Sequence, residues 1–387
     1  MPIHTPPRPW MNEELSLLRD TARRFFETEC VPRQQAWMAQ RHADRDIWRR
    51  AGAIGLLGAG IPEEYGGSGG HFLHQAVICE EQQRALVNSF SLNVHSGIVA
   101  HYLLDYASAS QKDRWLPGLA SGDIVAAIAM TEPGAGTDLQ RIKTTALREG
   151  DHYIVRGAKT FITNGLNADL VLTAVKTDPQ ATARGVSLLA IDVRDLPGFT
   201  RGKPLDKIGQ HGQDTVELFF DDVRVPVENL LGAQEGRGFS QLMQQLPRER
   251  LLIAVGAAAT MQRAVDDTLA YVNERQVFGA PLMAMQNTRF KLAECQTHAT
   301  LARSFVDDCI GRLLRNELDV PTAAMAKWWT TDMLCRVVDE CLQLHGGYGY
   351  INDYPIARMF ADARVGRIYG GANEVMKEII ARGLTPA

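Results

Sequence analysis

The first third of the chain has a helical pattern of hydrophobic and polar positions. From Asn12 onward, apolar residues recur mostly every three or four positions, which is typical of helices packed on a core. The first helix is predicted to begin after Asn12, a residue type that caps helices well, and to end by Pro32. A glycine-rich loop at 61–70 separates it from further helix. We therefore expect an α-helical domain over residues 1–123.

The pattern changes in the middle of the chain, where short apolar runs are separated by Gly, Asn, Asp and Pro. These runs lie at 124–130, 153–155, 160–163, 170–176, 186–193 and 216–220. Short strands at this spacing, with no helical pattern between them, predict an antiparallel sandwich or barrel. We expect this middle antiparallel β domain over residues 124–237.

The helical period returns after about Gly238 and continues to the end of the chain. The predicted helices lie at 240–275, 286–315 and 322–345, with a shorter one after Ala372. Pro321 suits the first turn of the third helix, and Gly346 suits its end. Long helices with short joints predict a C-terminal four-helix-bundle domain over residues 238–387. The expected fold class is α+β, in the order helical, β, helical.

Charge and cysteine content exclude several classes of protein. The 387 residues carry 41 Lys and Arg against 45 Asp and Glu, a formal net charge of −4, with no strongly basic segment. Nucleic-acid binding needs a surface that neutralises phosphates, so we expect no nucleic-acid partner. The six cysteines include no C-x-x-C pair, which favours reduced, buried thiols over a zinc site or a disulfide scaffold. We expect no metal.

Two segments bear on location. The start of the chain, Met1–Trp10, has no apolar segment of the signal-peptide kind, and its prolines would break a targeting helix. The longest apolar stretch, about 251–261, falls well short of the roughly 20 residues that span a bilayer. We therefore expect a cytoplasmic protein without a membrane span.

Three motifs of known function have little support in this chain. Residues 66–70 fit G-x-S-x-G, but no strand precedes them, as a nucleophile elbow requires. No G-x-G-x-x-G follows a strand, so a Rossmann nucleotide site has no support. His71 and His74 have the spacing of metal ligands on a helix, but no third ligand is near them. We expect them to be surface or loop histidines.

The most informative segment is 129–138, AMTEPGAGTD, directly after a predicted strand. Its glycines let the backbone approach a planar or phosphorylated ligand, and Thr131 and Thr137 offer hydroxyl groups. Alone, the segment fits a simple turn as well as a cofactor loop. Four further segments accompany it: KTFITNG at 159–165, ERQVFG at 274–279, QLHGGYG at 343–349 and RIYGGANE at 367–374.

These five segments, in this order, resemble the acyl-CoA dehydrogenase family over nearly the whole chain. Within the family, segments 245–254 and 369–378 are most similar to the long-chain acyl-CoA dehydrogenases. The resemblance implies non-covalently bound FAD, an acyl-CoA substrate, an electron-transferring flavoprotein as acceptor and a homo-oligomer, which by the family pattern is a homotetramer. A flavin-dependent oxidase on the same fold and a non-catalytic acyl-thioester-binding protein are the alternatives.

The resemblance also implies which residues contact FAD. On the flavin side these are Ile128, Ala129, Met130, Thr131, Gly136, Phe161, Ile162, Thr163, Ala372, Asn373 and Glu374. Contacts to the adenosine and pyrophosphate of a neighbouring subunit's FAD are expected from Arg275, Phe278, Gln286, Gln343, Leu344, His345, Gly346 and Gly347. An arginine opposite a pyrophosphate makes physical sense as a charge-assisted contact.

The catalytic base is displaced from its commoner position. Most of the family has a glutamate after the tyrosine of the last motif, where this chain has Gly370. Long-chain and isovaleryl-type relatives place the base on another helix, at the position that matches Glu249. On spacing alone, such a glutamate is more often a solvated or ion-paired helix residue. Because position 370 holds a glycine in place of that glutamate and position 249 holds a glutamate, the resemblance implies that Glu249 is the base.

The resemblance further implies how the substrate is held. The backbone N–H of Gly370, with a ribityl hydroxyl of FAD, is expected to bind the thioester oxygen. Expected substrate contacts are Thr137, Ser240, Arg250 and Gly371. The helix that lines the acyl chamber corresponds to 87–97, where small serines leave room and Phe90 adds a bulky ring. The expected substrates are medium-chain, long-chain or branched acyl-CoAs.

Overall fold

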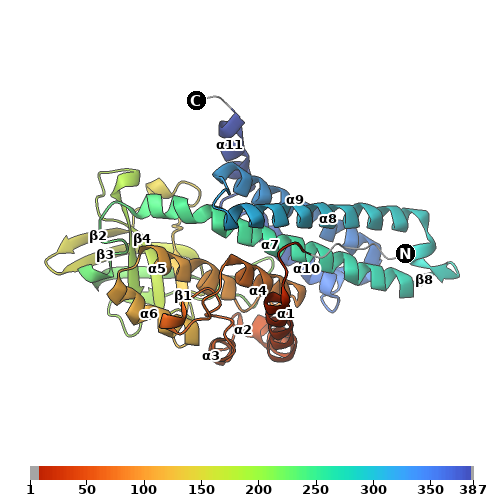
Figure 1. The fold of residues 1–387 in the computed structure, drawn as a ribbon, viewed down its shortest axis with the longest axis horizontal. Helices are drawn as coiled ribbons and strands as arrows, with labels where there is room; N and C mark the ends of the chain where they lie inside the picture. The colour runs from red at the N-terminus through yellow and green to blue at the C-terminus, as the bar shows by residue number, and fades with distance from the viewer. Residues whose placement is uncertain (1–7, 385–387) are drawn as a thin grey trace.

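Residues 8–384 are described by a computed structural model, in which a β domain lies at one end of a long helical body (Figure 1). Most of the N-terminal segment on which the prediction of no export rests lies outside the described residues. Within them, no helix combines the length and the hydropathy needed to cross a bilayer. The domain boundaries at 123/124 and 237/238 stay predictions.

The N-terminal part is helical, as predicted. Its helices are α1 (Glu13–Phe25), α2 (Gln34–Gln40), α3 (Asp46–Ala53), α4 (Phe72–Arg84), α5 (Ala100–Tyr106) and α6 (Ala109–Ser121). Asn12 caps α1 by accepting a hydrogen bond from the Leu15 N–H at 2.8 Å, as the sequence predicted. A π-helical segment, Asn93–Val99, leads directly into α5. Such segments widen a helix and often occur at functional sites.

The prediction of surface or loop histidines is right for His71, which is exposed and precedes α4, and wrong for His74, which is buried within that helix. His71 is the N-cap of α4, and its ring accepts a hydrogen bond from the backbone N–H of Leu73. The ring of His74 in turn accepts from the His71 N–H at 3.1 Å. His74 is buried, and its other nitrogen lies 2.8 Å from a carboxylate oxygen of Glu14 on α1. Both histidines therefore organise the start of a helix.

The middle part is a seven-stranded sheet with the order β1-β4-β2-β3-β7-β6 and β5 paired to β4. Its strands are β1 (Ala126–Ala129), β2 (Thr145–Glu149), β3 (His152–Thr163), β4 (Leu170–Lys176), β5 (Val186–Asp192), β6 (Phe199–Arg201) and β7 (Thr215–Pro226). The sheet is mostly antiparallel, but β1 pairs with β4 in parallel. The runs at 153–155 and 160–163 form one bent strand with register shifts. Strands β2 and β6 were not predicted.

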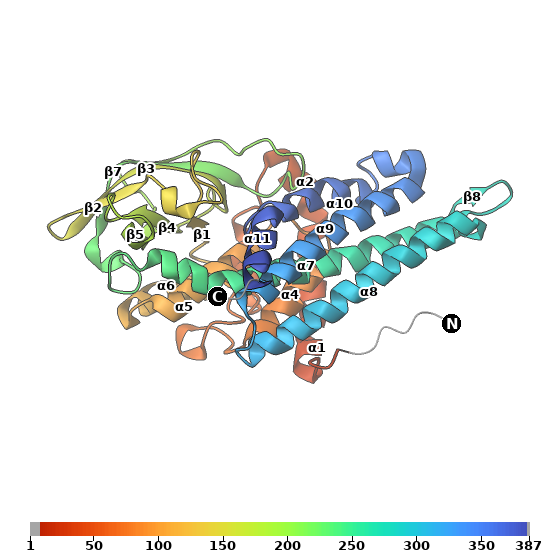
Figure 2. The same cartoon turned by 90° about the horizontal axis from the view of Figure 1, so that it is seen from above.

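The C-terminal part contains α7 (Gly238–Glu274), α8 (Gln286–Leu314), α9 (Val320–His345), α10 (Pro355–Ala363) and α11 (Asn373–Leu384). The first three run side by side (Figure 2). A hairpin of β8 (Gln276–Val277) and β9 (Ala280–Pro281) joins α7 to α8. Pro321 lies in the first turn of α9 and Gly346 ends that helix, as predicted. Helix α10 was not predicted.

Helix α7 connects the two ends of the molecule and fixes the site. It reaches from the β domain along the full bundle (Figure 1), and its fully buried Leu251, Val255 and Met261 pack against α4, α8 and α9. Each such side chain contributes about 1.5–3 kcal/mol through burial. This packing sets the rotation of α7, so that Glu249 and Ile253 face a cavity.

The cysteines are free thiols, as predicted. Five of the six are buried, and Cys335 is partly exposed. No group of three or more metal-ligating side chains occurs among residues 8–384.

Candidate active site

A cavity of about 470 Å³ lies where the β domain meets the helical body. It is lined by the end of β1, the bend of β3, the π-helical segment before α5, helix α7 and the loop before α11. It brings together these predicted site residues: Ile128, Met130, Thr131, Gly136, Thr137, Phe161, Ile162, Thr163, Glu249, Arg250, Gly370 and Gly371. Segments more than 200 positions apart in the sequence therefore form one site.

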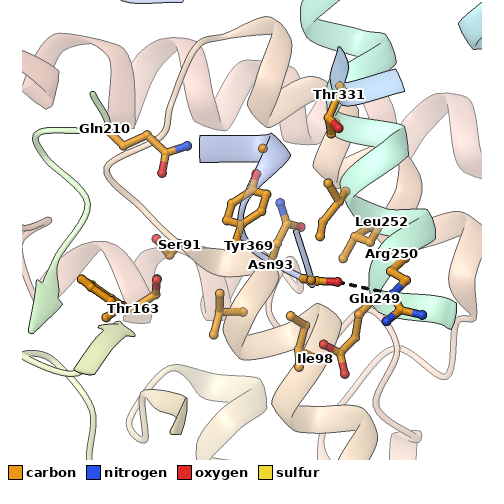
Figure 3. A pocket seen from close by; sticks show the side chains of 18 of the residues that line it. Ser91, Asn93, Ile98, Thr163, Gln210, Glu249, Arg250, Leu252, Thr331 and Tyr369 are labelled. Carbon is orange, nitrogen blue, oxygen red and sulfur yellow. Dashed lines mark hydrogen bonds between the residues drawn. The ribbon is translucent and has the colours of Figure 1, made fainter. Parts of the chain in front are cut away.

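The carboxyl group of Glu249 is a buried acid of this cavity, contributed by α7. Its side chain lies beside Ile98 (Figure 3), and the residue is only 7% exposed. The hydroxyl of Tyr102 on α5 donates a hydrogen bond to Oε1 at 2.8 Å. Burial raises the pKa of Glu249 to about 7, against the opposing effects of Tyr102, Arg250 and Arg248. A carboxyl group with this pKa suits general-base work near neutral pH.

The loop before α11 is held in place from two sides. Arg250 donates from Nε to the carbonyl of Gly370 at 3.3 Å (Figure 3). Lys327 on α9 donates to the Gly371 carbonyl at 2.7 Å and to Asn373 Oδ1 at 2.9 Å. Within the described residues, the N–H of Gly370 makes no hydrogen bond to protein, so it is free to donate to a ligand.

The backbone conformation at position 370 and the proximity of Ile253 both favour a glycine there. Its φ of 64° lies in the left-handed region that disfavours side chains. A Cβ atom added here would lie 2.5 Å from Cδ1 of Ile253, a side chain that lines the cavity.

We expect Gly370→Ala to slow turnover about 3- to 30-fold, because the N–H donor remains while strain and the clash with Ile253 displace it. Ile253→Val removes the clashing Cδ1 atom and should recover part of the loss in the double variant. Steady-state kinetics of both single variants and the double variant measure this coupling. Independent, additive effects would contradict the steric explanation.

A buried ion pair orders the glycine-rich segment that follows β1. Lys159 on β3 is fully buried and donates to Glu132 Oε1 at 2.8 Å and to the Met130 carbonyl at 3.1 Å. Glu132 also accepts from the backbone N–H groups of Lys143 and Thr144. Burial lowers the pKa of Lys159 to about 8. Both residues lie within the sequence motifs, but sequence analysis gave neither of them a role.

Comparison with known proteins agrees with this geometry. Three family models match: the acyl-CoA dehydrogenase N-terminal domain at residues 12–123, the middle domain at 127–223 and the C-terminal domain at 236–385. The chain belongs to the acyl-CoA dehydrogenase family. The resemblance predicted from the five motifs is therefore confirmed, as is the α+β fold class.

Individual acyl-CoA dehydrogenases match over nearly their whole length. The mouse (Mus musculus) long-chain specific enzyme is 43% identical over 373 residues, which cover 96% of this chain and 86% of the relative. Isovaleryl-CoA dehydrogenase of Pongo abelii is 34% identical, with 96% and 89% covered. The crystal structure of acyl-CoA dehydrogenase from Geobacillus kaustophilus superimposes with a TM-score of 0.96 at 45% identity, covering 98% of this chain and all of that one.

Acyl-CoA dehydrogenases use FAD, and the β-domain side of the cavity fits a flavin ring. Ile128, Met130 and Ile162 supply an apolar wall, and Phe161, 66% exposed with a φ of 59°, presents an uncovered aromatic ring. The hydroxyl groups of Thr131 and Thr163 form no hydrogen bonds with described residues. A planar ring with an apolar face and polar edges matches this combination.

Some predicted contacts of the acyl-CoA dehydrogenase lie beside the cavity without lining it. Ala129 is buried within the sheet, and Ser240 bonds to the Arg237 carbonyl in the first turn of α7. Ala372 and Glu374 lie at the start of α11. The side chain of Asn373 is engaged inside the protein, with Lys327 and, at 2.9 Å, with Asp332. It therefore supports the loop, and its predicted contact with FAD stays a prediction.

The predicted adenosine-side residues do not reach the cavity of their own chain. They lie around the β8 hairpin, the start of α8 and the end of α9, and the hairpin is at the far end of the bundle (Figure 2). These residues are Arg275, Phe278, Gln286, Gln343, Leu344, His345, Gly346 and Gly347. Phe278 is 99% exposed, Arg275 lies over the ring of Tyr348, and His345 stacks on Tyr271. Their contact with a neighbouring subunit's FAD stays a prediction.

Beyond Glu132 and Lys159, two further residues of the site were not predicted from the sequence, Tyr102 and Lys327. Tyr102 lies 147 positions from Glu249, and Lys327 lies 44 positions from Gly371. Neither belongs to a motif, so only the fold brings them to the site.

Proposed function

We propose that this FAD-dependent acyl-CoA dehydrogenase converts medium-chain, long-chain or branched acyl-CoA to the trans-2-enoyl-CoA, with Glu249 as the base. The observation that carries the proposal is the buried carboxyl group of Glu249, which shares one cavity with Gly370. The position after Tyr369 holds no carboxylate, and a carboxyl group with a raised pKa lines the same cavity from α7.

Different residues of the chain act on different atoms of the acyl thioester. Glu249 removes the proton from Cα, which its pKa of about 7 permits near neutral pH. The Gly370 N–H donates to the thioester oxygen, on which negative charge develops, and such a donor contributes on the order of 3 kcal/mol. When bound, FAD supplies the hydride acceptor for Cβ. Thr131, Phe161 and Thr163 orient the flavin ring, and Arg250 holds the Gly370 loop.

The wall of the cavity formed by α4 and α7 supports an acyl chamber. Gly256 and Ala257 of α7 leave space there, and Cys79 of α4 lines the same wall. A Cβ atom at Gly256 would contact Gln83 and Cys79. The Phe90 ring lines the cavity and is fixed edge-on against Trp48, with ring centroids 4.7 Å apart.

The oligomeric state, the electron acceptor and the location of the enzyme also belong to the proposed function. The β8 hairpin lies at the end of the helical body away from the β domain (Figure 2), and this position of the predicted adenosine contacts supports a homo-oligomer, a homotetramer by the family pattern, in which each FAD contacts two subunits. Electrons pass to an electron-transferring flavoprotein, and the enzyme acts in the cytoplasm.

The first test is anaerobic titration of the purified yellow holoenzyme with acyl-CoAs of graded length and branching. We expect the flavin absorbance near 450 nm to bleach on substrate addition, with little peroxide formed when air is admitted without an acceptor. Turnover with peroxide formation would indicate an oxidase, and no bleaching with any acyl-CoA would indicate a binding protein. The kcat/KM values across the panel define the substrate.

A further inference from the structure

Helix α5 meets α7 along a continuous polar seam next to the cavity. The seam is formed by His101, Tyr102, Asp105 and Tyr106 of α5 with Gln244, Gln245, Arg248 and Glu249 of α7. Within it, Tyr106 donates to Gln244 Oε1 at 2.9 Å, and Gln245 bonds to Asp105. Residues spaced three and four apart on each helix thus pair across the interface.

Tyr102 is the member of this seam that reaches the reactive carboxyl group. It is fully buried, and its hydroxyl donates to Oε1 of Glu249 at 2.8 Å. In the part of the chain that the structure describes, no hydrogen bond engages the other oxygen, Oε2. One carboxylate oxygen is therefore fixed by the protein, and the other is left to accept a proton.

We propose that Tyr102 is a positioning residue for the reaction, whose hydroxyl orients the Glu249 carboxylate and stabilises its ionised form in the buried site. The inference rests on the proposed function, in which Glu249 is the base. A hydrogen bond donated to a carboxylate favours the charged form and so opposes the effect of burial. Without it, Glu249 would hold its proton to a higher pH.

The other charged groups around Glu249 stay in place when this hydroxyl is removed. On its own helix these are Arg248 and Arg250, and on α5 they are His101 and Asp105, which face Arg248. Lys327 on α9 faces Arg250, and Tyr369 lies in the loop before α11. Burial and Arg248 lower the pKa of His101, so its ring is neutral and accepts from Arg248.

The test is the pH dependence of anaerobic flavin bleaching at saturating acyl-CoA in Tyr102→Phe holoenzyme. In the wild type, the rate should rise with pH through about 7, because the ionised carboxylate is the base. In Tyr102→Phe, we expect this acid limb to move up by about one pH unit. The rate at pH 7 would fall about fivefold, and the difference would nearly vanish by pH 9.

The matched control is Tyr106→Phe, which removes the same group one turn along the same helix. Tyr106 touches Gln244 and not Glu249. The acid limb of the pH–rate profile of Tyr106→Phe should therefore coincide with that of the wild type. A uniform rate loss in Tyr102→Phe with an unmoved limb would overturn the proposal and indicate a packing role.

A second variant covers the case in which Tyr102→Phe fails to fold or to retain FAD. Replacement of Tyr102 by para-aminophenylalanine keeps a weaker donor in the same place. The acid limb of its pH–rate profile should lie between that of the wild type and that expected for Tyr102→Phe. An acid limb identical to that of the wild type would again overturn the proposal. Failure of the base assignment is distinguishable, because Glu249→Gln would then bleach as fast as the wild type.

Discussion

Glu249→Gln should lower the rate of anaerobic flavin bleaching by about 10³-fold or more while FAD stays bound. The amide has the shape of the carboxyl group but cannot accept the Cα proton, and removal of a positioned base typically costs 10²- to 10⁴-fold. The Tyr102 hydroxyl can still donate to the amide oxygen, so the seam between α5 and α7 is retained. Stopped-flow absorbance with a substrate from the acyl-CoA panel measures the rate.

Glu80→Gln is the matched control for this experiment. Glu80 on α4 is also buried, and burial likewise raises its pKa to about 7. It pairs with Arg8 and lines a different cavity, so its loss should affect stability and leave bleaching intact. Wild-type bleaching in Glu249→Gln would reject the base assignment. Loss of bleaching in Glu374→Gln instead would move that role to the start of α11.

Lys327→Met should impair both stability and turnover, because one buried ammonium group holds the loop that carries Gly370. Its removal leaves the Gly371 carbonyl without its donor and leaves the Asn373 amide oxygen with only the longer hydrogen bond from Thr331. Each unpaired buried acceptor costs about 1–3 kcal/mol of unfolding free energy. A displaced Gly370 N–H would lower kcat by about 10²-fold, as the loss of an oxyanion donor does. Denaturant unfolding and steady-state kinetics measure the two effects.

The control for the second effect is Lys176→Met. Lys176 on β4 is buried and donates to the backbone carbonyls of Ala181 and Thr182, away from the cavity. Its loss should destabilise the protein with kcat unchanged. If Lys327→Met is destabilised to a similar degree and also keeps its kcat, the loop does not depend on Lys327 for its catalytic geometry.

Long elements were predictable from the sequence because their patterns repeat many times. The expected helices at 240–275, 286–315 and 322–345 agree with α7, α8 and α9 to within two residues at each end. The nine residues of α10 and the three of β6 are too few to show a period. Strand β6 exists because it pairs with β7, which local sequence does not report.

Residues of the site were predictable from the sequence only where they belong to a family motif. Segments around Thr131, Phe161 and Gly370 came from the family pattern, and the structure brings them into one cavity. The parallel pairing of β1 with β4 depends on contacts between residues such as Ala127 and Val171, 44 positions apart in the chain. Hydrogen bonds between distant helices, such as that of Tyr102, likewise depend on the completed fold.

The thiol of Cys79 lines the cavity in which the proposed mechanism places a reactive product. An enoyl thioester is an electrophile that adds thiolates at its β carbon, and the thiolate is the nucleophilic form of cysteine. Burial raises the pKa of Cys79 to about 12, so the thiol keeps its proton near neutral pH. The burial that suits this wall to an acyl tail therefore also protects Cys79 from alkylation by the enoyl thioester product.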